Sequence, residues 1–168
     1  MYSRYAQMNE MIKRALQSIN ISSQLEPPGL MREDGKRPDG VTNIAWERGR
    51  ALVWDATCSD SLARTNRNES EGPGFSSENA ARKKHLKYIR IKDNYCFLAF
   101  SVETLGPWAS ESISFLKKVG SALHRVSGDP RSHQFLVQRL SQAIQRGNSL
   151  SIRSTLPPSQ AFDEVFYL

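Results

Sequence analysis

Two aspartates, Asp39 and Asp55, are the residues of this sequence best suited to bind a divalent cation. Asp39 stands in a Pro-Asp dipeptide just before a predicted strand, and Asp55 lies in the middle of the apolar segment 51–58. Burying an ionised carboxylate is costly unless it is paired or coordinates a metal. Magnesium prefers oxygen ligands, so two converging carboxylates could hold it. The alternative is a salt bridge from Asp55 to Arg37 or Arg50, and the sequence alone leaves both open.

The turn between two predicted strands decides whether these carboxylates can meet. We expect the strands to flank a three-residue loop, 47–49, that ends in a left-handed glycine. In that register Asp39 faces Thr57, and Asp39 and Asp55 become diagonal neighbours on one face, about 7–8 Å apart. A loop of two or four residues would instead put the two acids on opposite faces of the sheet.

The elements that must position this pair follow from hydrophobic periodicity and turn residues. We expect helices over 5–20, 78–92, 110–127 and 130–147, strands over 41–46, 51–58 and 95–103, and a short strand near 21–26. This order predicts a single mixed α/β layered domain over residues 1–150. Residues 59–77 are polar and rich in glycine, which predicts a flexible loop, and residues 151–168 are expected to form a C-terminal tail.

Composition narrows the classes of protein that this chain can belong to. It has 168 residues, a net charge of +6 and a pI near 9.5, and a basic balance fits a polyanionic partner. No apolar run approaches the length of a membrane span, and the N-terminus lacks the layout of a secretory signal. The lack of both features predicts a soluble intracellular protein. The two cysteines form no zinc motif and are expected to be buried small hydrophobes in a reducing compartment.

Three motifs in a fixed order resemble the PD-(D/E)XK superfamily, and more closely the restriction-like endonuclease domain of retrotransposon polyproteins. They are Arg37-Pro38-Asp39, the strand that carries Asp55, and the lysine-rich helix 79–88 that ends in Lys-Tyr. The strand and turn over 97–106 also resemble that group, and the resemblance covers roughly residues 4–148. It implies a restriction-endonuclease-like core, with a mixed central sheet flanked by helices and two extra C-terminal helices.

The resemblance also implies a catalytic site. Asp39, Asp55 and the Ala56 carbonyl would bind Mg²⁺ for phosphodiester hydrolysis. The superfamily has lysine two residues after the second acid, but this chain has Thr57. The retroelement group supplies its lysine from the following helix, which here points to Lys87 first and Lys84 second. These lysines could instead form a solvated basic face, and that alternative stays open.

The function implied is a magnesium-dependent DNA endonuclease, or its retroelement-derived remnant. Arg37, Arg82 and Lys83 are expected to contact DNA. Further expectations are a reverse transcriptase domain in a parent polyprotein, a nuclear location and no membrane partner. The alternatives are an inactive basic nucleic-acid-binding module of the same fold and a protein-interaction domain that docks through its last two helices. We expect Glu10 to face solvent and Glu103 to be exposed or salt-bridged.

Overall fold

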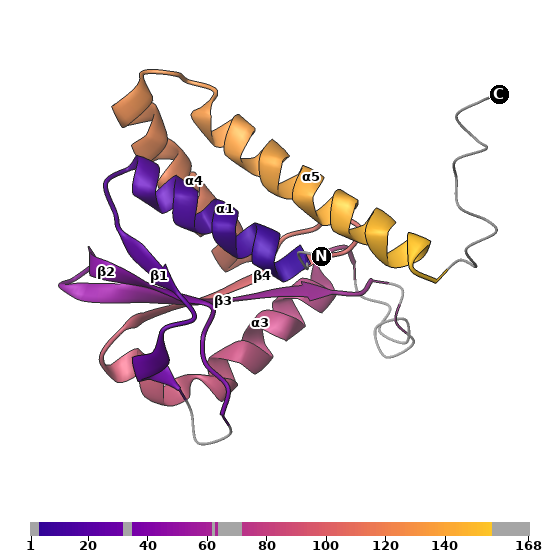
Figure 1. Ribbon diagram of the computed structural model, residues 1–168, viewed down its shortest axis with the longest axis horizontal. Helices are drawn as coiled ribbons and strands as arrows, with labels where there is room; N and C mark the ends of the chain where they lie inside the picture. The colour runs from indigo at the N-terminus through magenta and orange to yellow at the C-terminus, as the bar shows by residue number, and fades with distance from the viewer. Residues whose placement is uncertain (1–3, 32–34, 62, 64–71, 156–168) are drawn as a thin grey trace.

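A four-stranded sheet forms the centre of the computed structural model, which describes residues 4–31, 35–61, 63 and 72–155 (Figure 1). The strands are β1 (Ser23–Leu25), β2 (Gly40–Glu47), β3 (Arg50–Ser59) and β4 (Cys96–Glu103), adjacent in that order. β1, β2 and β3 pair antiparallel, whereas β3 and β4 run parallel. The expected short strand near 21–26 is therefore present, and it forms one edge of the sheet.

The hairpin between β2 and β3 differs from the three-residue loop expected. Glu47 pairs with Arg50, so the turn is Arg48-Gly49 alone, and both residues have positive φ, 50° and 72°. Positive φ at both positions is typical of the type I′ turn, whose twist matches that of the flanking strands. A turn of this length was expected to separate the two acids.

Irregularities in β2 bring back to one face of the sheet the two acids that a two-residue turn would otherwise have put on opposite faces. The ladder pairs Ala45 with Ala51 but Val41 with Val53, so β2 bulges between these points. The Thr42 hydroxyl stabilises the bulge, because it accepts a hydrogen bond from Leu52 N–H at 2.9 Å and donates one to the Ile44 carbonyl. From the turn to Val41, β2 uses three residues more than β3. This odd shift returns the two acids to a common face.

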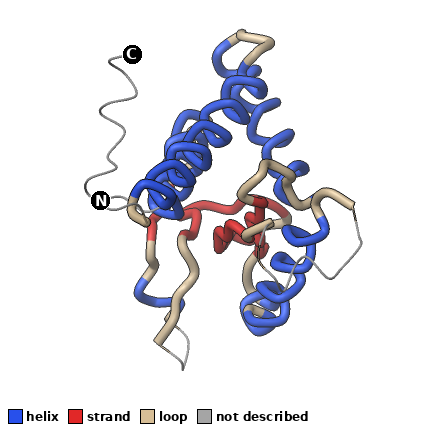
Figure 2. Tube along the Cα trace, turned by 90° about the vertical axis from the view of Figure 1, so that its right-hand side faces the viewer, coloured by secondary structure: helices blue, strands red, loops and turns tan. Residues whose placement is uncertain are grey.

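Three helices cover one face of the sheet (Figures 1 and 2). They are α1 (Arg4–Ser18), α4 (Ser110–Ser127) and α5 (Ser132–Arg153). Their apolar stripes and the sheet form the main core, which includes Leu16, Trp54, Phe100, Leu116 and Leu140. Gly147, expected to end the last helix, is instead buried within α5, which runs to Arg153. The glycine therefore serves packing and not capping.

In the part of the chain that the structure describes, one helix, α3 (Phe75–Lys87), covers the other face and is followed by the 3₁₀ segment η2 (Ile89–Asp93) (Figure 1). The predicted helix 78–92 is thus two pieces, which begin earlier than expected. Gly74 caps the start, with φ of 95°, and Ser77 lies one turn inside, where its hydroxyl donates to the Gly74 carbonyl. Much of the predicted flexible loop (62, 64–71) and of the tail (156–168) lies outside the described residues.

The coarse fold predicted from the sequence is confirmed. The chain is an α/β domain with a mixed sheet between helices, and two further helices follow the last strand. A 3₁₀ turn, η1 (Pro28–Leu30), stands between β1 and β2. Within the described part of the chain, no helix has both the length and the apolar character needed to cross a membrane.

Candidate functional site

The two acids lie side by side, Asp39 just before the start of β2 and Asp55 in the middle of β3. Gly40 pairs with Trp54, and Asp39 N–H donates to the Trp54 carbonyl at 3.0 Å, so the next step of the ladder brings Asp39 opposite Asp55. This is closer than the expected diagonal placement, since directly opposed residues have Cβ atoms roughly 4.5–5.5 Å apart. The Asp39 carboxylate also accepts a hydrogen bond from Ala56 N–H at 2.6 Å. The sheet backbone therefore fixes both residues.

The electrostatics of Asp39 reflect this proximity. Burial, followed by the neighbouring charge of Asp55, raises the pKa of the Asp39 carboxyl from 3.8 to about 6. The hydrogen bonds from Ala56 and Asn9 act in the opposite direction but are weaker. Two carboxylates this close repel each other when both are ionised, so they bind a proton or a cation readily.

Asp55 is the more buried acid, with a residue exposure of 5%. Its Oδ1 accepts a hydrogen bond from the Lys84 ammonium at 3.0 Å. Its Oδ2 is buried and has no hydrogen-bond donor among the described residues. The expected salt bridge to Arg37 or Arg50 is not the one found, because Lys84 on α3 is the partner. One oxygen of a buried carboxylate is thus left for another ligand.

The lysine that contacts Asp55 is Lys84, the second of the two expected, whereas a catalytic role for Lys87 stays a prediction. α3 turns one side toward the sheet, where Ala81 and Tyr88 are buried at 3% and 1% exposure. Lys84 follows Ala81 by three residues and precedes Tyr88 by four, so it shares their side. The Lys87 ammonium instead lies 5.0 Å from the centroid of the Tyr88 ring.

Polar contacts dock the helix that carries Lys84. The only other buried residues of α3 are Ser76 and Ser77. His85 Nε2 hydrogen-bonds Glu111 Oε1 at 2.8 Å, and Glu111 Oε2 accepts from Ala99 N–H at 3.3 Å. Ala99 is the β4 partner of Asp55. Burial raises the pKa of Glu111, against the opposing effect of His85. The network ties α3 to the strand beside the acid pair.

Asn9 is a residue of the site that the sequence reasoning did not select. It is 7% exposed and accepts a hydrogen bond from Trp54 Nε1 at 3.2 Å. It also hydrogen-bonds Asp39, which favours the ionised carboxylate. The signal was present, because Asn9, Ile12 and Leu16 follow i, i+3, i+7 spacing, which puts a polar residue on the buried stripe of α1.

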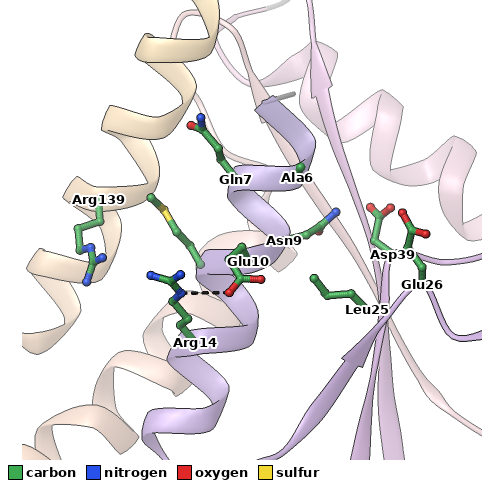
Figure 3. Close-up of a pocket in the computed structure, with 10 residues that line it drawn as sticks. Ala6, Gln7, Asn9, Glu10, Arg14, Leu25, Glu26, Asp39 and Arg139 are labelled. Carbon is green, nitrogen blue, oxygen red and sulfur yellow. Dashed lines mark hydrogen bonds and ion pairs between the residues drawn. The ribbon is translucent and has the colours of Figure 1, made fainter. Parts of the chain in front are cut away.

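An open groove of about 710 Å³ leads to Asp39 (Figure 3). Asp39 and Glu26 lie on one side of it, while Arg139 of α5 lies on the other side of α1. The residues that line it come mainly from α1: Ala6, Gln7, Asn9, Glu10, Met11, Arg14, Leu25, Glu26, Asp39 and Arg139. Of the two aspartates, Asp39 is therefore the one that lines this groove, while Asp55 does not line it and is the more buried.

The remaining predicted residues are dispersed around this centre. Arg37 forms an ion pair with Glu26 at the groove. Arg82 and Lys83 are exposed on α3. Ala56 donates its N–H to Asp39, and the role of its carbonyl as a metal ligand stays a prediction.

Two further acids lie apart from the pair. Glu10 is partly exposed, as expected, and pairs with Arg14 at 3.1 Å. Glu103 is not exposed, and it forms no salt bridge with a described residue: it is 6% exposed and accepts hydrogen bonds from Ser61 Oγ and Ser77 N–H.

The donor atoms of the acid pair are carboxylate oxygens, the kind of ligand that magnesium prefers. Among the described residues, no cluster of three or more His, Cys, Asp or Glu side chains is arranged to hold a metal ion. Two carboxylates remain, one with an unpartnered buried oxygen. Mg²⁺ is commonly held by one or two carboxylates, and waters and substrate phosphates complete its shell. The residues present therefore fit a magnesium ion.

Two comparisons with known proteins identified no relative of this chain. No protein-family model matches the chain, and a search of curated proteins gives no match either.

Proposed function

We propose that this chain is a magnesium-dependent DNA endonuclease with a restriction-endonuclease-like core, or a remnant of one. The observation that carries the proposal is the opposed pair Asp39 and Asp55 with Lys84 on the same side. Two acids from neighbouring strands can hold the metal that such hydrolysis uses. One amine from the following helix can stabilise the charge that develops on the phosphate.

Each residue has a distinct role in the proposed reaction. Asp39 and Asp55 would hold Mg²⁺, and Asn9 and the Ala56 amide orient the Asp39 carboxylate. When bound, the metal polarises the phosphate and lowers the pKa of water. Lys84 would contact the phosphate and stabilise the negative charge that develops on it. Lys84 thereby takes the part that Thr57 cannot, because a threonine hydroxyl carries no positive charge.

The test is nicking of supercoiled plasmid DNA by the purified chain in 5–10 mM Mg²⁺, roughly the range in which weakly held magnesium sites fill. We expect Asp55→Asn to abolish nicking and Lys84→Gln to reduce it by about a hundredfold, the usual size of one electrostatic contact. Lys87→Gln, a matched change three residues away, should retain activity. Activity that survives Asp55→Asn would refute the proposal.

A second candidate is an inactive nucleic-acid-binding module of the same fold. Thr57 favours it, because the position that carries lysine in the superfamily has no charge here. The ion pair between Lys84 and Asp55 favours it too, since a permanent pair would compete with a metal. DNA binding without nicking at any Mg²⁺ or Mn²⁺ concentration would select this candidate.

The wider context follows from the resemblance alone. A retroelement origin, a reverse transcriptase partner within a longer polyprotein and a nuclear location are proposals of the same standing as the activity.

A further inference from the structure

Nearly all of the net charge of this protein lies in one short segment. From Arg82 to Asp93 the chain has six lysines and arginines and one acid, a net charge of +5. The whole chain has 23 basic and 17 acidic residues, a net charge of +6. The rest of the chain is therefore close to neutral. The contact of Lys84 with Asp55 explains only one of the positive charges on α3 and η2, so the others need a separate explanation.

The charged side chains of this segment face solvent. Arg82 and Lys83 on α3, and Arg90 and Lys92 on η2, are all exposed. They lie on the side of α3 and η2 away from the sheet, since Ala81 and Tyr88 occupy the inner side. A basic face of this kind raises the local concentration of a polyanion and binds it in a salt-dependent way.

The basic surface continues onto the hairpin between β2 and β3. Arg50 Nη1 donates to the Lys92 carbonyl at 3.0 Å, which joins η2 to the start of β3. Arg48, in the turn two residues before, is exposed. β4 begins three residues after η2 ends, and its first residue, Cys96, pairs with Leu52. The surface therefore runs from the acid pair along α3 to the turn end of the sheet.

We propose that this surface, Arg82, Lys83, Arg90, Lys92, Arg48 and Arg50, binds the phosphate backbone of duplex DNA beside the acid pair. From Lys84 to Lys92 the chain advances about 15 Å, given the rise of a helix and of a 3₁₀ segment. That length covers roughly four base pairs at 3.4 Å each. The inference takes the identity of the ligand from the proposed function and adds where and how that ligand lies.

The apolar residues of this surface favour a duplex over a single strand. Leu86 and Ile89 are 72% and 60% exposed, and both are aliphatic. Among the described residues, the exposed large aromatic side chains are Tyr5 and Phe135, on α1 and α5. Single-strand binding generally uses aromatic side chains on which bases stack. This surface offers charge without stacking, which suits the outside of a duplex.

The experiment measures binding of a fluorescein-labelled 20-base-pair duplex by anisotropy, in EDTA, over a series of NaCl concentrations. The variant is Arg48→Gln with Lys92→Gln. The matched control is Lys117→Gln with Arg125→Gln, which removes the same charge from exposed positions of α4 on the other side of the sheet. We expect the salt slope to become shallower by about 1.8 for the first pair, because each phosphate contact contributes about 0.9.

Affinity in 0.1 M NaCl should fall by about tenfold or more for that pair and should not change for the control pair. Equal salt slopes for the two pairs of substitutions would overturn the inference. Equal slopes are the result expected if the surface docks an acidic protein instead of DNA. A single strand that binds as tightly as the duplex would also overturn it. Asp55→Asn should keep the wild-type slope. Loss of nicking therefore tests the proposed function separately, and either proposal can fail alone.

Discussion

Replacement of Asp39 by asparagine should stabilise the metal-free protein at neutral pH. The pKa of Asp39 is raised from 3.8 to about 6 by burial and by Asp55. The unfolded chain therefore releases this proton near pH 4, whereas the folded chain holds it until near pH 6. Stability of the wild type must fall as pH rises through this window, because the ionised carboxylate is tolerated less well when folded.

The size of the effect follows from the shift. One pKa unit corresponds to 1.36 kcal/mol, so the shift of Asp39 costs the folded state about 3 kcal/mol at pH 7.5. Asparagine keeps an oxygen to accept the Ala56 N–H, and its amide can donate to the unpartnered Oδ2 of Asp55. We expect Asp39→Asn to raise the free energy of unfolding by about 1–3 kcal/mol, with the upper value set by the pKa shift.

Urea denaturation in EDTA at pH 7.5 and pH 4.5 measures this directly. At pH 4.5 the gain should shrink to about a third, because the folded wild type is then mostly protonated. Asp93→Asn, at an exposed acid, should change the free energy of unfolding by under about 0.5 kcal/mol at either pH. A variant no more stable than the wild type at pH 7.5, or a gain independent of pH, would refute the raised pKa of the Asp39 carboxyl.

Magnesium should reverse the order of stability if the pair is a metal site. A ligand at a hundredfold its dissociation constant stabilises the folded state by about 2.7 kcal/mol. Wild-type protein should therefore gain stability on addition of Mg²⁺, while Asp39→Asn, which lacks one ligand, should gain little. Equal gains for the two proteins would remove the basis for magnesium at this site.

Two further substitutions test the surroundings of the pair. Lys84→Gln leaves the buried Asp55 carboxylate without its cation and should lower the free energy of unfolding, measured with urea, by about 1–3 kcal/mol. The control Lys87→Gln should lower it by under about 0.5 kcal/mol. Equal losses for the two variants would contradict the contact between Lys84 and Asp55. Gly40→Ala should cost about 3 kcal/mol or prevent folding, since a Cβ there would lie 2.1 Å from the buried Trp54 ring; a wild-type melting temperature would show that the approach is wrong.

The elements of the fold were predictable because their patterns are local. Period-3.6 stripes marked α1, α4 and α5, and apolar runs marked β3 and β4. The hairpin was predicted wrongly because its register depends on an interaction within β2. The Thr42 hydroxyl takes the place of a backbone acceptor opposite Leu52, and nothing in local propensity distinguishes this from a regular strand. Parity arguments from turn length fail where a bulge interrupts a strand that flanks the turn.

In the site, too, the sequence indicated which kind of residue is involved but not which residue it pairs with. Asp55 is an acid in an apolar strand, so the sequence indicated that it needs a partner. Which lysine is that partner depended on which side of α3 faces the sheet. Sequence spacing put both Lys84 and Lys87 on one broad helical face. Burial of Ala81 and Tyr88 narrows that face to the side where Lys84 lies. Asn9 is a polar residue within an apolar stripe, and that pattern could have identified it as a site residue. Among the α1 residues whose burial is described, it is the one where a buried position and a hydrogen-bonding side chain coincide. It lies against Asp39.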